Sequence, residues 1–192
     1  MTILILGLAL FLGTHSIRIV ADEWRNAQVA RHSEMAWKGG YALASLLGFG
    51  LIIWGFGMAR MSPQVLWQPP AAMRHLSSLL MLASFVLLAA TYVPRNRIKA
   101  AVHHPMLLAT VVWAVAHLLT NGTLADVILF GSFLLWSVLA LRASHQRDRA
   151  AGTVYPAGTL SATFAAVAVG VVLWGLFSYW LHSLLIGVHP FA

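Results

Sequence analysis

Residues 104–142 read HPMLLATVVWAVAHLLTNGTLADVILFGSFLLWSVLALR and decide the fold class. Two apolar stretches in this segment, 104–121 and 123–142, are each about as long as a helix that crosses a bilayer. Between them stands the dipeptide Asn121-Gly122, which is typical of a tight turn. The segment therefore predicts two antiparallel membrane helices joined by a short connection.

Four further apolar stretches of similar length occur in the chain, at 2–20, 39–59, 75–93 and 160–186. The 192 residues are 60% hydrophobic and 9% charged, with a mean hydropathy of +0.80. Such values are typical of polytopic membrane proteins and lie outside the range of soluble domains. We therefore predict an all-α polytopic membrane protein with six transmembrane helices, forming a single domain over residues 1–192 in contact with the lipid bilayer.

The basic residues are unevenly distributed among the connections between these helices. All of the 12 Lys and Arg residues except Arg60 and Arg74 lie in or beside the first, third and fifth connections. By the positive-inside rule these connections are cytoplasmic, and both termini are periplasmic. We therefore expect a multi-pass protein of the bacterial inner membrane, with an uncleaved first helix. The net charge of +7 follows from this distribution, and no nucleic-acid partner is expected.

Three of the nine histidines interrupt apolar stretches: His15, His117 and His182. An imidazole within a bilayer is costly, and such residues usually face the protein interior or a cofactor. His117 belongs to a polar stripe at helical spacing, which consists of Thr110, Trp113, His117 and Asn121. The stripe predicts either contact with a cofactor or substrate, or hydrogen bonds that hold neighbouring helices together.

The other candidate residues lie nearer the helix ends. His15 shares a helix face with Arg18, which forms an i,i+4 pair with Asp22 near the cytoplasmic interface. His182 lies about one turn from the outer end of its helix, where an interfacial role is also expected. His104 is offset from His117 by about 220° around the helix, so the two cannot bind one ion. We expect His104 to contact an anionic headgroup or a haem propionate.

The residue types favour a b-type haem over other chemistry. Cysteine is absent and the chain has five acidic residues, so neither a thiolate site nor a carboxylate relay across the membrane is expected. A zinc site would need about four converging ligands, which the membrane segments do not offer. Haem b needs neutral imidazoles, an apolar slot and basic groups for its propionates.

Two histidine pairs are candidates for the axial ligands of this haem. His15 and His117 lie on different helices, but His15 is nearer the cytoplasmic end and His117 nearer the outer end. This pairing requires tilted helices or helix boundaries shifted by a turn. His117 and His182 match better in depth, which makes His182 a substitute ligand.

Two stretches resemble the NnrU family of membrane proteins. Residues 7–18, GLALFLGTHSIR, resemble its opening span. Residues 104–122 resemble its motif HP…W-x-x-x-H-L-x-x-N-G, with His104, Trp113, His117 and Asn121 at the matching positions. The resemblance extends over essentially the whole chain. It implies an inner-membrane protein associated with denitrification.

Relatives of this family look like the 15-cis-zeta-carotene isomerase, a haem b enzyme with histidine axial ligands. By motif matching, the resemblance implies haem ligation by His15 and His117, with His104, Trp113, Arg18 and Asn121 beside the cofactor. The function implied is that of a haem-dependent isomerase-like or redox protein, with a small apolar substrate expected in the isomerase case. One alternative is a non-enzymatic assembly or stability factor for a respiratory or denitrification complex. A weaker likeness, in His103-His104-Pro105, is to isoprenylcysteine-type membrane methyltransferases.

Overall fold

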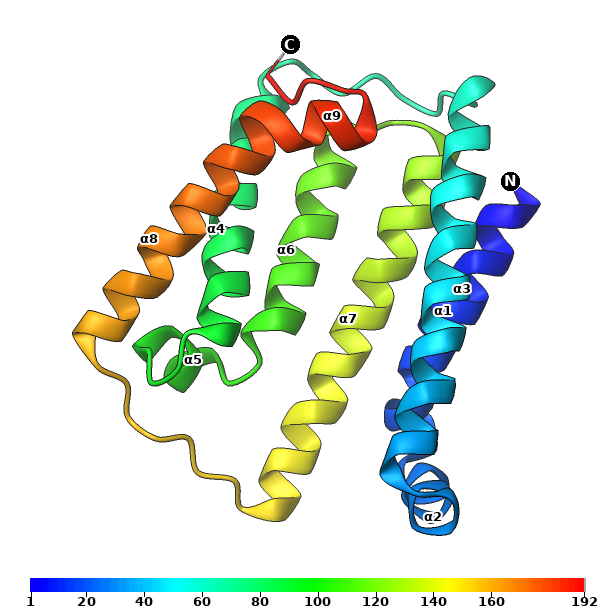
Figure 1. The fold of residues 1–192 in the computed structure, drawn as a ribbon. Helices are drawn as coiled ribbons and strands as arrows, with labels where there is room; N and C mark the ends of the chain where they lie inside the picture. The colour runs from blue at the N-terminus through cyan, green and yellow to red at the C-terminus, as the bar shows by residue number, and fades with distance from the viewer. Residues whose placement is uncertain (192) are drawn as a thin grey trace.

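A computed structural model describes residues 1–191, and in this part of the chain the regular secondary structure is entirely helical (Figure 1). The predicted all-α fold class is therefore confirmed. Every apolar stretch singled out in the sequence forms a helix. The helices are α1 (Thr2–Val20), α2 (Asp22–His32), α3 (Glu34–Met61), α4 (Met73–Tyr92), α5 (Arg97–Val102), α6 (Pro105–Thr120), α7 (Leu124–Ala151), α8 (Leu160–Leu176), the π-helical η1 (Phe177–Leu181) and α9 (His182–Ile186).

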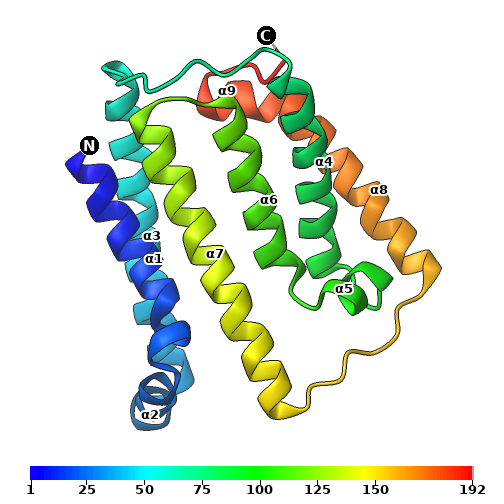
Figure 2. The same cartoon turned by 180° about the vertical axis from the view of Figure 1, so that it is seen from behind.

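The six long helices pack as a row in which α7 stands between two groups. On one side α7 contacts α1, which packs along α3; on the other side it contacts α6, which packs on α4, and α4 packs on α8 (Figures 1 and 2). The short helices α2 and α5 lie at the same end of the long helices, measured along the helix axes (Figure 1). The N-terminus and helix α9 both lie at the opposite end of the long helices, on different parts of the row (Figure 1). Candidate residues on α1 and α6 are therefore brought to opposite flanks of α7.

Five segments are long and apolar enough to cross a membrane: α1, α3, α4, α7 and the continuous segment Leu160–Ile186. Helix α6 is apolar but has 16 residues, or about 24 Å of helix, against about 30 Å of bilayer hydrocarbon. The chain is therefore a multi-pass membrane protein by the length and composition of these five segments. The sixth predicted segment, 104–121, forms α6, which runs antiparallel beside α7 in the manner of its neighbours (Figure 2).

Glycines allow α1 and α3 to approach closely. A Cβ added at Gly7 would lie 2.6 Å from the backbone nitrogen of Ile52, and one at Gly48 would lie 2.7 Å from that of Phe11. Real Cβ atoms do not approach other atoms so closely, so any larger residue would push the two helices apart. Small residues at a membrane helix interface have this role in general. The helix packed against Gly48 of α3 is thus α1 of the same chain.

The Asn121-Gly122 turn forms the expected tight connection between α6 and α7. Thr123 then begins α7 with a reciprocal cap, in which its side chain and that of Asp126 each accept a hydrogen bond from the other's backbone nitrogen. The carbonyl of Gly122 also accepts hydrogen bonds from the backbone of Leu66 and Trp67. These hydrogen bonds hold the Pro-containing connection between α3 and α4 against the turn.

Two segments expected to be cytoplasmic loops are helical instead. Helix α7 continues past 142 to Ala151, so His145 lies on a helix and not in a loop. The added residues, ASHQRDRAA, include several good helix formers, and Gly152 ends the helix in the left-handed conformation at φ 59°. The first connection likewise contains α2, which includes His32. In these segments the polar residues show where the chain leaves the apolar layer. They do not show where a helix ends.

Candidate functional site

His15 lies in an aromatic environment between three helices. Its ring stacks on Phe11 at 4.2 Å between centroids, and it contacts Tyr41 of α3 and Trp136 of α7 at 5.2 and 5.9 Å. The Nδ1 atom lies 2.7 Å from the carbonyl oxygen of Phe11. Because a carbonyl can only accept, Nδ1 carries the proton in this contact. A neutral His15 ring therefore leaves the lone pair of Nε2 available to a ligand.

One buried polar group beside His15 has no hydrogen-bond partner among the described residues. It is the indole Nε1 of Trp136, whose ring meets the His15 ring edge-on. Buried polar groups are normally paired, since leaving one unpaired costs about 1–3 kcal/mol. An unpaired group beside an available imidazole nitrogen is what a site for a polar or metal-containing ligand would present.

His117 is held in the same manner on the other flank of α7. Its Nδ1 lies 2.9 Å from the carbonyl oxygen of Trp113, and its ring stacks on Phe130 at 4.5 Å. Trp113 packs on Phe130 and Phe133 of α7. The stripe of α6 thus faces α7 at Trp113 and His117. Asn121, at its end, donates to the carbonyl of His117 and closes the last turn of the helix.

His182 lies where the last membrane segment changes its winding. Residues Phe177–Leu181 form a turn of π-helix directly before it, which displaces His182 from the α-helical face that it would share with Trp174 and Ser178. Such π-turns are often found at functional sites. The Nδ1 of His182 lies 2.7 Å from the carbonyl of Val188, which again leaves Nε2 available.

The structure does not bring His15 and His117 face to face. Their contacts on α7, Trp136 and Phe130, are six positions apart, which corresponds to about 9 Å along the helix. The ring of Phe133 lies between the two sites, 5.8 Å from Phe11 and 5.5 Å from Trp113. His15 and His117 therefore lie at different depths along α7, as the sequence predicted. Aromatic side chains fill the space between them.

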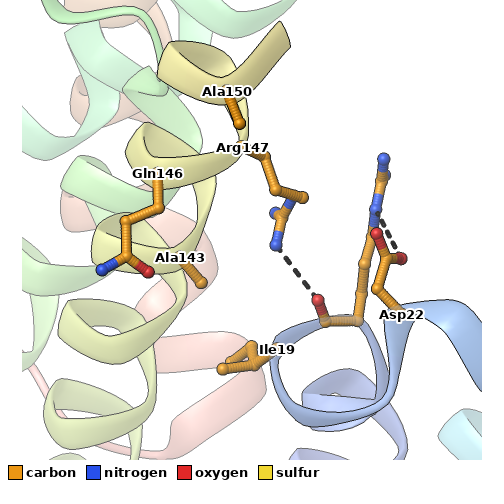
Figure 3. Close-up of a pocket in the computed structure, with 7 residues that line it drawn as sticks. Ile19, Asp22, Ala143, Gln146, Arg147 and Ala150 are labelled. Atoms are coloured by element: carbon orange, nitrogen blue, oxygen red, sulfur yellow. Dashed lines mark hydrogen bonds and ion pairs between the residues drawn. The ribbon is translucent and has the colours of Figure 1, made fainter.

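Arg18 marks a pocket where the ends of α1 and α7 meet. Its side chain pairs with Asp22 at 3.7 Å, as the i,i+4 spacing predicted, and its carbonyl accepts a hydrogen bond from Arg147 (Figure 3). The pocket measures about 300 Å³ and is lined also by Ile19 and Gln146. A second pocket of about 420 Å³ shares both arginines and reaches His104. Two guanidinium groups give this end of the molecule the charge that an anionic group requires.

His104 belongs to a polar cluster at the same end of the molecule. Its Nε2 lies 2.7 Å from Oδ2 of Asp148, and the Tyr155 hydroxyl donates to the same oxygen at 2.8 Å. Burial, together with the hydrogen bond to Asp148, raises the pKa of Tyr155 to about 12, so this hydroxyl remains a donor at neutral pH. Sequence reasoning missed Asp148 and Tyr155 as partners of His104. The His145 and Asp148 spacing of i,i+3 would have placed both on one face, had the helix been extended to 151.

The model of the family described as NnrU protein matches residues 3–190, which is nearly the whole chain. The chain belongs to the NnrU family. No curated protein and no solved structure matches it. The resemblance drawn from residues 7–18 and 104–122 is therefore confirmed. Membership supports a membrane protein related in general to nitrogen-oxide metabolism.

Proposed function

We propose that this NnrU-family protein binds a b-type haem in the bacterial inner membrane and serves nitrogen-oxide respiration as a redox or isomerase-like protein. In this proposal α6 counts as the sixth crossing and both termini are periplasmic. The N-terminus and α9 lie at the same end of the long helices, which agrees with an even number of crossings (Figure 1). Family membership supports the link to nitrogen-oxide metabolism and to denitrification.

The haem proposal depends on a hydrogen bond that His15 and His117 both make through Nδ1. In both rings Nδ1 is held by the carbonyl four residues earlier, which fixes the tautomer and the orientation and leaves Nε2 as the metal-binding atom. Haem and metal ligands commonly have their second ring nitrogen held in this way. The rings around both histidines are apolar, as a haem requires of its neighbours, and imidazole donors fit haem iron. Bound haem would supply an iron able to exchange electrons or to contact a double bond of a small apolar substrate.

The arrangement ranks the candidate ligands without reducing them to one pair. His117 is the common member, because it has either His15 or His182 as its partner. If His15 is the partner, the ring of Phe133 and the rings packed on it must move. If His182 is the partner, α9 must approach α6. Arg18 and Arg147 are candidate partners for the propionates, on the side of His15.

The alternative function, a non-enzymatic assembly factor, would make the polar stripes of the helices structural. The hydrogen bonds that join α4 to α6 are donated by other residues: Ser77 to the carbonyl of Ala116, and Ser84 to that of Ala109. His15 and His117 bond to their own helices instead. Their imidazoles are therefore not needed as bridges between helices, which favours the ligand-binding role.

The visible spectrum of protein purified from haem-replete cells tests the proposal. We expect a Soret band with sharp reduced α and β bands. The band should collapse in His117→Ala and shift in whichever of His15→Ala and His182→Ala removes the second ligand. His32→Ala, on α2, is the matched control and should leave the spectrum unchanged. A colourless wild-type preparation would contradict the proposal.

A further inference from the structure

A second group of potential ligands lies apart from His15 and His117, where the α5–α6 connection meets the end of α7. One ligand atom each of His103, His145 and Asp148 lies within 4.8 Å of the others. In the part of the chain that the structure describes, neither His103 nor His145 has a ring nitrogen in a hydrogen bond. Three half-buried donors thus converge, and two of them have unused lone pairs.

The backbone at His103 is strained in a way that places its ring in this group. His103 has φ 62° and ψ −49°, and the nitrogen of His104 donates to the carbonyl of Val102 at 2.6 Å. This is a tight γ-turn with a positive φ, which is rare and costly for a residue with a side chain. The ring then stacks on Tyr155 at 4.2 Å, with an interplanar angle of 4°. Strain of this kind is typical of residues that a site requires in one position.

The carboxylate of Asp148 is oriented by two donors that use the same oxygen. Both His104 Nε2 and the Tyr155 hydroxyl donate to Oδ2, whereas Oδ1 accepts no hydrogen bond from the described residues. Metal-binding carboxylates are commonly held by such outer hydrogen bonds. The group thus has three inner ligands and a shell that orients one of them.

We propose that His103, His145 and Asp148 bind a divalent transition-metal ion such as Zn²⁺. Two imidazoles and one carboxylate suit borderline metals, and three protein ligands leave a coordination position for water or a substrate. Tetrahedral coordination would bring the ligand atoms to about 3.4 Å from one another, a contraction within the reach of side-chain rotation. The three ligand residues are distinct from His15 and His117.

Zinc binding by the full chain, purified on a tag without histidine and stripped with a chelator, tests this proposal. We expect one Zn²⁺ per chain in a competition titration with a chromogenic chelator. Asp148→Asn and His145→Asn should each weaken binding at least tenfold. Tyr155→Phe should weaken it about tenfold by loosening the carboxylate. His32→Asn, outside the group, is the matched control and should bind as the wild type does.

A second readout separates loss of a ligand from loss of the fold. Circular dichroism and gel-filtration elution of the metal-free Tyr155→Phe and His145→Asn variants should match the wild type. Co²⁺ in place of Zn²⁺ should give visible absorption bands that His145→Asn abolishes. Equal Zn²⁺ affinity in the wild type, Asp148→Asn and His145→Asn would overturn the proposal, as would the absence of tight binding. Neither readout depends on the Soret band, so failure here is distinct from failure of the haem proposal.

Discussion

The histidines inside the helix row and those at its α5 end are held in opposite ways. His15 and His117 each stand alone, with Nδ1 on their own helix and aromatic rings around them. His103, His104 and His145 lie within 5.1–6.0 Å of a neighbouring imidazole and share Asp148. Isolated imidazoles surrounded by aromatic rings suit a planar cofactor such as haem, whereas a cluster with a carboxylate suits a bare cation. The difference teaches that histidine count alone does not identify the cofactor; the second nitrogen and the neighbours do.

Asp148→Ala should have the largest effect on stability, and only at the α5 end. The change leaves the donors of His104 and Tyr155 without their shared acceptor, so the free energy of unfolding should fall by more than in the other two variants below. Denaturant titration in detergent, followed by tryptophan fluorescence, measures this loss. The segment from Gly152 to Thr159 should also become sensitive to protease. If Asp148→Ala also abolished the Soret band, the histidines inside the helix row and those at the α5 end would belong to one site, and the distinction between them would be wrong.

The sequence predicts the helices far better than it predicts these two groups. Apolar length and the Asn121-Gly122 turn are local signals, and they placed α1, α6 and α7 to within a few residues in the apolar layer. The α5-end cluster depends on α7 continuing through a polar stretch, and on the γ-turn at His103, for which periodicity gives no signal. The separation of His15 from His117 depends on the row order of the helices, which is set by contacts such as Gly48 on Phe11 and not by any single segment.

His117→Phe should have a smaller effect on stability and a decisive effect on haem. Phenylalanine keeps the stacking on Phe130 and loses one hydrogen bond within α6, so the free energy of unfolding should fall by about 1 kcal/mol or less. The same denaturant titration measures it, and the Soret band of the variant should be lost. His15→Phe is the matched variant on the other flank of α7. A loss above about 3 kcal/mol in either variant would show that the imidazole is structural, in favour of an assembly factor.

Trp136→Phe should have the smallest effect on the haem-free protein, and this makes it the sharpest probe of the His15 side. The indole Nε1 of Trp136 is buried without a partner among the described residues, so removing it costs no hydrogen bond and relieves an unpaired donor. These gains offset the lost ring area, and the free energy of unfolding should change by less than about 1 kcal/mol. If haem binds beside His15 and this nitrogen donates to it, haem retention should fall several-fold in the same variant. Trp174→Phe, which removes the other unpaired buried indole nitrogen, is the matched control. Unchanged haem retention in Trp136→Phe, with a loss in Trp174→Phe, would move the cofactor to the side of His117 and His182.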